Sequence, residues 1–312
     1  MYSPQYYFVH SSYVPGCTPY WSALFNEKKA REPQKHLPSC SSATNQSSSS
    51  SDCPYPTYDL VIDVSQVYCI GFFHFTIEVW PRIAPFLDAL LAKDMPPFAI
   101  RLGCAPLADF HQGMYELLGL ENVTLLDETT VHAKEVITPT EGFSHSPLLN
   151  YWNLIALRKH VRRRLTDKDT AISVSRSTEQ RPKIVMVIIR DASRRGDANI
   201  YNEKFLQQLS NGLGSGYNVT AFRSSDEQMM GCMACQVRAF MEADVIVGSH
   251  GAGLSHAMFA KAGAIIMERI VGGGDSGIYA ELAYLNQMKY FAMSNNAQAQ
   301  AYYDIILFAD SL

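Results

Sequence analysis

The stretch Val245-Ile-Val-Gly-Ser-His-Gly-Ala-Gly-Leu254 leads from a short apolar run directly into a glycine-rich turn. We interpret residues 244–247 as a strand and expect a helix to begin near His256. Glycines let the backbone turn sharply and approach a ligand closely. A helix N-terminus offers unpaired N–H groups to an anion, and ligands of open α/β sheets bind at the carboxyl ends of strands. The stretch therefore predicts a phosphate-binding turn, with a tight packing turn as the alternative.

A second candidate anion site follows the apolar run Lys183–Ile189. A continuous apolar run is typical of a strand that is buried on both faces. Arg190, Arg194 and Arg195 come directly after it, and arginine makes bidentate, charge-assisted hydrogen bonds to phosphate. The alternative is that these are surface arginines paired with neighbouring aspartates. Two such turns in one half of the chain favour a diphosphate ligand.

Predicted strands and helices alternate along the 312 residues, which favours an α/β fold with parallel sheets. The predicted strands are residues 59–64, 98–102, 123–126, 133–137, 183–189, 217–222, 244–247 and 264–268. The predicted helices are residues 72–91 (interrupted by Pro81 and Pro85), 111–118, 149–165, 202–209, 232–242 and a last one from 256.

The same alternation in both halves predicts two Rossmann-like domains with a cleft between them. Residues 1–57 contain a serine-rich, low-complexity run and are interpreted as a flexible tail. Residues 58–165 then form an N-terminal α/β domain, 166–182 a linker and 183–312 a C-terminal α/β domain. The basic run Arg162–Arg164 is interpreted as a solvated helix face.

The composition excludes some classes of function. A formal net charge of −4 does not suit a nucleic-acid-binding protein, which carries a strong basic excess. Residues 1–25 show no signal-peptide pattern, and no stretch approaches the roughly 20 apolar residues that span a bilayer. The seven cysteines do not indicate a disulfide framework. Cys232 and Cys235 have CxxC spacing without the further ligands of a zinc site, so we interpret them as structural.

An ordered set of motifs resembles glycosyltransferase family 61. Its most specific part is His-Gly-Ala-Gly-Leu at His250–Leu254. In the second half, the family pattern also matches Arg190, Arg195, Asn202, Glu203, Gln236, Ala243, Asp244, Phe259, Gly263, Ala264, Tyr279, Leu282, Ala283 and Tyr290. In the first half, it matches His74, Phe75, Glu78, Pro81 and Arg82, and the resemblance spans residues 60–295.

The resemblance implies a GT-B-like architecture and an inverting, metal-independent transfer from a nucleotide sugar. The absence of an Asp-x-Asp motif after a strand agrees with metal independence. By resemblance the donor is UDP-linked, the sugar is xylose, arabinose or N-acetylglucosamine, and the acceptor is a glycan or glycoprotein. The implied compartment is the Golgi or endoplasmic reticulum lumen, with three Asn-x-Ser/Thr sequons as weak support and any membrane association through a segment outside this chain.

The implied site has a donor side and an acceptor side. Arg190 and Arg195 are expected to hold the diphosphate, and Glu268 to contact the ribose. His74 and Glu78, one helical turn apart, are the candidates for the general base that deprotonates the acceptor, with a buried structural histidine as the alternative for His74. The remaining expected donor-side residues are Asn202, Gln236, His250, Gly251, Ala252, Gly253 and Leu254. No metal ligand or cofactor other than the donor is expected.

Three other functions were weighed. A catalytically inactive nucleotide-sugar or glycan-binding module would share the same motifs. An NAD-linked dehydrogenase is disfavoured because Gly-x-Gly-x-x-Gly is missing from the first strand–turn regions. A serine hydrolase is disfavoured because the chain has no Gly-x-Ser-x-Gly elbow.

Overall fold

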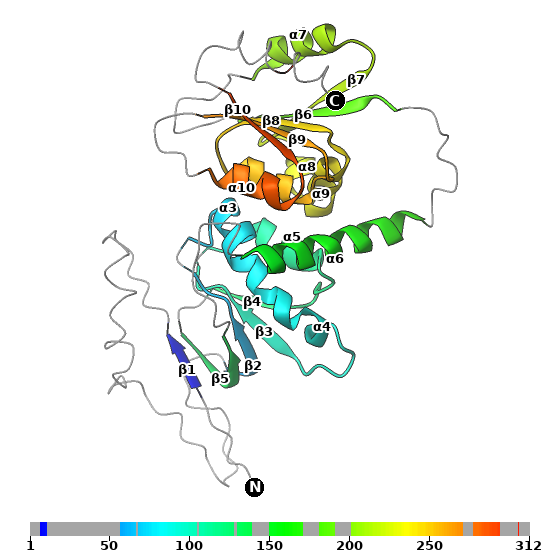
Figure 1. The fold of residues 1–312 in the computed structure, drawn as a ribbon. Helices are drawn as coiled ribbons and strands as arrows, with labels where there is room; N and C mark the ends of the chain where they lie inside the picture. Colours follow the sequence, from blue (N-terminus) through cyan, green and yellow to red (C-terminus); the bar gives the residue numbers. More distant parts are fainter. Residues whose placement is uncertain are drawn as a thin grey trace, which may run out of the picture.

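The computed structural model describes residues 7–10, 57–66, 68–104, 106–127, 130–138, 150–170, 181–190, 201–270, 277–293 and 305. These residues form two five-stranded sheets with helices between them (Figure 1). The predicted α/β class with parallel sheets is confirmed. Arg194 and Arg195 of the predicted site lie outside the described residues.

The second half of the chain forms a wholly parallel sheet in the order β10-β9-β8-β6-β7. Its strands are β6 (Lys183–Ile189), β7 (Tyr217–Arg223), β8 (Val245–Ser249), β9 (Ile265–Arg269) and β10 (Lys289–Met293). The central strands β6, β8 and β9 are apolar and buried, as their continuous hydrophobic runs predict. Because the strands are parallel, the turns after β6 and β8 meet at one edge of the sheet.

The first half forms a sheet in the order β1-β5-β2-β3-β4. Its strands are β2 (Thr57–Asp63), β3 (Phe98–Arg101), β4 (Thr124–Leu126), β5 (Thr130–Ile137) and β1 (Tyr7–His10), and only β1 runs antiparallel to its neighbour. Strand β1 corrects the interpretation of residues 1–57 as a tail for these four residues. Strand β1 pairs with the edge strand β5 through backbone hydrogen bonds. Such pairing does not require a periodic pattern of side chains, so the sequence did not predict it.

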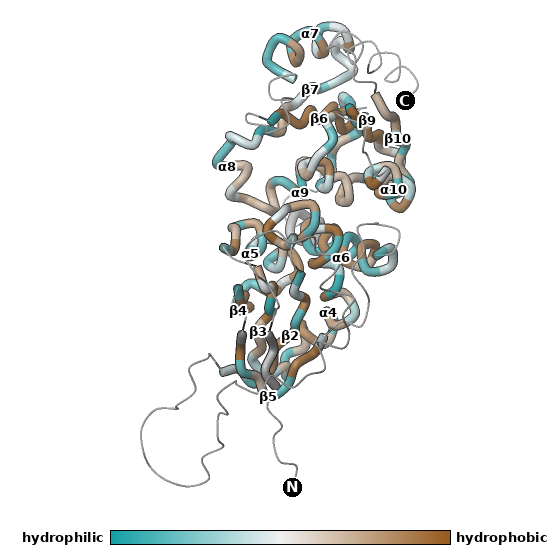
Figure 2. The backbone as a smooth tube through the Cα atoms, turned by 90° about the vertical axis from the view of Figure 1, so that its left-hand side faces the viewer, coloured by the Kyte–Doolittle hydropathy of each residue, from teal (hydrophilic) through white to brown (hydrophobic). Residues whose placement is uncertain are grey.

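Helices of both halves pack together between the two sheets (Figure 1). From the first half these are α3 (Phe72–His74), α5 (Asp109–Glu116) and α6 (Tyr151–Thr170). From the second they are α8 (Glu227–Met230), α9 (Met233–Glu242) and α10 (Ile278–Leu285), whereas α7 (Glu203–Leu213) covers the outer face of its sheet. One hydrophobic core runs through this layer, with the Trp80 and Phe259 rings 6.1 Å apart. Figure 2 shows apolar stretches along β6 and β9.

The prolines shape the helical segment at residues 72–91. After α3 it becomes a π-helix, η1 (Phe75–Val79), then a 3-10 helix, η2 (Trp80–Phe86), and finally α4 (Leu87–Leu90). Pro81 and Pro85 have no N–H to donate to an α-helical bond, which explains the tighter turn around them. Single π turns are frequent at functional sites, and this one includes Glu78 and is preceded by His74.

Other differences from the sequence-based expectation occur at element ends. Helix α6 continues to Thr170, inside the range interpreted as a linker. The expected helix from His256 begins earlier and is the 3-10 helix η4 (Ala252–Phe259). Helices α8 and α10 and strand β10 were not predicted as elements. Among the helices in the described part of the chain, none is long and apolar enough to cross a membrane.

A buried ion pair anchors the carboxyl ends of β2 and β3. Arg101 Nη1 lies 2.8 Å from Asp63 Oδ2 and 3.2 Å from Ser65 Oγ. The other carboxylate oxygen of Asp63 accepts the Ser65 N–H at 3.1 Å. These bonds hold the start of the loop that leads to His74.

Replacing Arg101 by Met should therefore destabilise the fold, because it leaves the Asp63 carboxylate buried without its cation. We expect a loss of about 3–5 kcal/mol of unfolding free energy, measured by urea denaturation. The matched control is Lys134→Met in the pair with Asp59, whose side chains are 47% and 64% exposed. That change should cost less than about 1 kcal/mol. Similar losses for both variants would contradict the anchoring role.

Candidate active site

The two predicted anion-binding turns meet at the carboxyl edge of the second sheet. Arg190 directly follows β6, and Gly251 follows β8, its neighbour in the sheet. Gly251 has a φ of 151°, a conformation that side-chain-bearing residues rarely adopt. A Cβ atom on Gly251 would lie 1.2 Å from Arg190 Nη2, so the guanidinium lies directly against the glycine backbone. The glycine is needed here both for its backbone angle and for this close approach.

A chain of hydrogen-bonding side chains holds His250. Its Nδ1 lies 2.5 Å from Glu268 Oε1, and Tyr290 donates its hydroxyl to Glu268 Oε2 at 2.6 Å. Glu268 is only 2% exposed, so both of its oxygens are used inside the protein. Tyr279 donates its hydroxyl to the Gly251 carbonyl at 2.6 Å and so holds the turn from the other side. The His250 ring is therefore held by Glu268 of β9.

The inner face of η4 is tied to α9 through Gln236 and His256. Gln236 Nε2 donates to the Met230 carbonyl at 3.0 Å, and its Oε1 lies 2.8 Å from His256 Nε2. The imidazole stacks between Phe72 and Phe240, with centroid distances of 4.5 and 4.8 Å. Burial lowers the pKa of His256 to about 4, so the ring is neutral at physiological pH. Gln236, predicted on the donor side, is buried behind the turn rather than exposed on it.

Arginines of α6 cover the carboxyl end of η4. Arg158 Nη2 donates to the Ala260 carbonyl at 2.5 Å, and Arg162 Nη1 donates to the Phe259 carbonyl at 2.9 Å. Burial and the neighbouring Arg162 charge lower the pKa of Arg158 to about 10. Cations at the end of a helix satisfy carbonyl groups that lack intrahelical partners. The interpretation of Arg162–Arg164 as a solvated face is therefore wrong for Arg162.

His74 and Glu78, the predicted acceptor-side pair in the first half of the chain, are in hydrogen-bonding contact. His74 Nδ1 lies 2.9 Å from Glu78 Oε1, and Gln66 donates to the other Glu78 oxygen. The Glu78 side chain is fully buried, whereas the His74 side chain is 33% exposed. Glu78 is thus placed to orient His74, and His74 is the member of the pair that a substrate can reach.

The Tyr279 ring connects the two sides of the site. Its centroid lies 5.9 Å from the Phe73 ring and 5.4 Å from the His250 ring. Because Phe73 precedes His74, the acceptor-side pair and the glycine-rich turn lie on either side of one tyrosine. The tertiary structure therefore places residues separated by almost 180 positions in one neighbourhood.

The other residues predicted on the donor side differ in burial and in their partners. Asn202 is the N-cap of α7, where its side chain accepts the Phe205 N–H at 3.0 Å. Leu254 is buried in the core, while Ala252 and Gly253 are half-buried. Among the described residues, no cluster of three His, Cys, Asp or Glu side chains is arranged to hold a metal ion.

Sequence reasoning did not assign a role to Gln66, Phe73, His256 or Tyr279. The contacts that define their roles join each of them to a residue at least 12 positions away, so their local sequence does not mark them. The family pattern included Tyr279 and Tyr290 without a function. The structure supplies one for each, on Gly251 and on Glu268.

A parallel α/β fold with cationic and glycine-rich turns at one sheet edge defines a class of enzymes that bind phosphorylated ligands. The model of the family described as Glycosyltransferase 61 matches residues 72–267. The chain belongs to this family and is a glycosyltransferase, which confirms the resemblance seen in the sequence.

Other comparisons add little. The crystal structure of a family 9 glycosyl transferase from Veillonella parvula DSM 2008 is similar, with a TM-score of 0.33 and 8% identity over 82% of this chain and 90% of that one. No curated protein matches the chain.

The low pKa of His256 predicts acid sensitivity. Below its ordinary pKa of 6.5 the unfolded chain takes up a proton that the folded state does not bind until about pH 4. Stability should therefore fall as pH falls through this window, by ~3 kcal/mol in total. A His256→Phe variant, stacked between the same two phenylalanines, should show a flatter pH slope in urea titrations. An unchanged slope would contradict this assignment.

Proposed function

We propose that the protein transfers a sugar from a UDP-linked donor to a hydroxyl of a glycan or glycoprotein, with inversion at the sugar carbon. The observation that carries the proposal is the Arg190 guanidinium lying against Gly251. It combines a fixed positive charge and an open backbone turn at the carboxyl edge of a parallel sheet. This is the position where such sheets bind phosphorylated ligands.

The donor side would act on the leaving diphosphate. As the bond between the sugar carbon and the phosphate oxygen breaks, negative charge grows on the diphosphate. Arg190, joined by Arg195, would stabilise that charge through preorganised hydrogen bonds without requiring a metal ion. Glu268 and Tyr290 would fix the ring orientation of His250 at the same turn, so we assign Glu268 a positioning role in place of the ribose contact expected from the sequence.

The acceptor side would supply the base. His74 accepts the proton of the acceptor hydroxyl as its oxygen bonds to the sugar carbon on the face opposite the leaving diphosphate. Hydrogen bonding of Nδ1 to buried Glu78 leaves Nε2 as the proton acceptor and stabilises the imidazolium that forms. A partly exposed histidine held by a buried carboxylate suits this task better than Glu78 itself.

The substrate class and compartment follow the family. We propose xylose, arabinose or N-acetylglucosamine as the sugar, a GT-B-like cleft between domains as the site, and the Golgi or endoplasmic reticulum lumen as the location. The Cys69–Cys104 disulfide supports an oxidising compartment. Thermal stabilisation by a panel of nucleotide sugars identifies the donor, because a ligand of the native state raises the melting temperature.

Removal of the Arg190 charge should weaken donor binding. We expect Arg190→Ala to raise the Kd for the nucleotide diphosphate roughly 10–100-fold in calorimetry, with chelator present throughout. Gly251→Ala should do the same, because the added methyl group displaces the guanidinium. The control is Gly263→Ala, also at positive φ but with open space around it. Unchanged affinity in both site variants, or binding only with added metal, would contradict the proposal.

Loss of the base should affect turnover more than binding. We expect His74→Asn to lower kcat by about 10²–10⁴-fold with little change in donor affinity. Glu78→Gln keeps the shape but weakens the orientation of His74, so it should lower kcat by a smaller factor. Tight donor binding without any sugar transfer by the unmodified protein would instead identify an inactive binding module.

A further inference from the structure

The CxxC motif forms a disulfide at the start of α9. Cys232 is the N-cap residue, and it is bonded to Cys235 one turn later. The Cys232 sulfur also accepts the Cys235 backbone N–H at 3.2 Å. The CxxC spacing, interpreted from the sequence as structural, did not by itself predict this bond. Cys235 is exposed and Cys232 half-buried, whereas both residues of the Cys69–Cys104 disulfide are buried.

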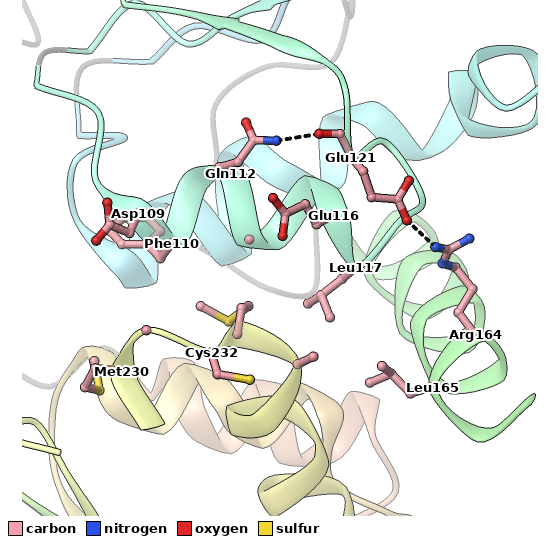
Figure 3. Close-up of a pocket in the computed structure, with 14 residues that line it drawn as sticks. Asp109, Phe110, Gln112, Glu116, Leu117, Glu121, Arg164, Leu165, Met230 and Cys232 are labelled. Carbon is pink, nitrogen blue, oxygen red and sulfur yellow. Dashed lines mark hydrogen bonds and ion pairs between the residues drawn. The ribbon is translucent and has the colours of Figure 1, made fainter. Parts of the chain in front are cut away.

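A cavity of about 540 Å³ opens beside this disulfide, between α5 and α9 (Figure 3). Cys232 lies on its α9 side, and Asp109 and Glu116 of α5 lie across from it. Glu121 also lines the cavity and is paired with Arg164 at 2.9 Å. Cys235 therefore lies at the protein surface, whereas Cys232 lines a cavity that contains acidic residues.

Hydrogen bonds of Gln236 join the segment that contains the disulfide to η4, which follows the glycine-rich turn. Gln236 follows Cys235 on α9, and its amide bridges the Met230 carbonyl before the disulfide and His256 within η4. The Cys232–Cys235 bond lies within the segment between Met230 and Gln236, which the Gln236 hydrogen bond joins end to end. The corner between α8 and α9 is thus joined to η4 through the buried Gln236 side chain.

We propose that Cys232–Cys235 is a reversible thiol–disulfide exchange site whose reduction loosens η4. A thiolate of an incoming dithiol attacks the exposed Cys235 sulfur, the disulfide bond breaks, and Cys232 leaves as a thiolate. The second thiol of the reductant then releases Cys235 and forms its own disulfide. Two electrons and two protons pass from the dithiol to the cysteine pair, which ends as two thiols.

The position of Cys232 favours this step. Its departing thiolate is stabilised by the Cys235 N–H and by the positive end of the ten-residue helix α9. The partner is a dithiol compound, or a protein with two reactive thiols, that reaches Cys235 from the surface.

The first experiment maps the thiols of the intact protein. Graded dithiothreitol, followed by iodoacetamide and peptide mass spectrometry, should label Cys232 and Cys235 at roughly tenfold lower reductant than Cys69 and Cys104. Coincident labelling of both pairs would overturn the exchange site.

The second experiment tests the connection to η4 by hydrogen exchange and requires no sugar donor. Reduction should make amides of residues 252–259 exchange roughly threefold faster, while those of β2 stay unchanged. The Cys232→Ser/Cys235→Ser variant keeps a capping oxygen and should match the reduced protein without reductant. Unchanged exchange in η4 of the reduced protein would overturn the coupling, whatever the outcome for sugar transfer.

Discussion

The 3-10 helix η4 is held by polar groups from helices of both halves of the chain. Helices of this type have poorer hydrogen-bond geometry than α-helices and are uncommon beyond a few residues, so this eight-residue segment depends on its surroundings. Tyr279 holds the turn before it, Gln236 holds His256 on its inner face, and the α6 arginines satisfy its last carbonyls. The donor-side turn is shaped by this support.

This support requires burying the polar ring of His256, which is stacked between Phe72 and Phe240. His256 is wholly buried and neutral, so it carries one N–H, which it donates either to Gln236 Oε1 at 2.8 Å or to the Gly253 carbonyl at 3.0 Å, depending on the tautomer. A buried polar group is tolerated when its hydrogen bonds are made, and it then specifies one arrangement of the surrounding side chains. In the proposed donor site, a rigid turn would stabilise the charge of the leaving group with little rearrangement.

The site also explains why the two halves share one core. The acceptor-side pair of His74 and Glu78 belongs to the first half, whereas the cationic turn belongs to the second. Contacts of Tyr279 with Phe73 and of His256 with Phe72 join them across the layer of helices. In this arrangement the same aromatic packing that stabilises the fold also sets the spacing between the two groups of functional residues.

The sequence by itself determined the parallel α/β class, most of the strands, the family, and the turns at Arg190 and His250. These features depend on local hydrophobic periodicity and on glycine and arginine at fixed positions after strands, which can be read from neighbouring residues. The tertiary structure decided that Arg190 lies against Gly251, that both Glu268 oxygens are used internally, that Cys232 and Cys235 are bonded, and that β1 joins the edge of β5. The three arrangements other than the cysteine bond join residues far apart in the chain, and no local pattern specifies such pairings. The CxxC spacing was visible in the sequence, but only the backbone at the start of α9 brings the two sulfurs together.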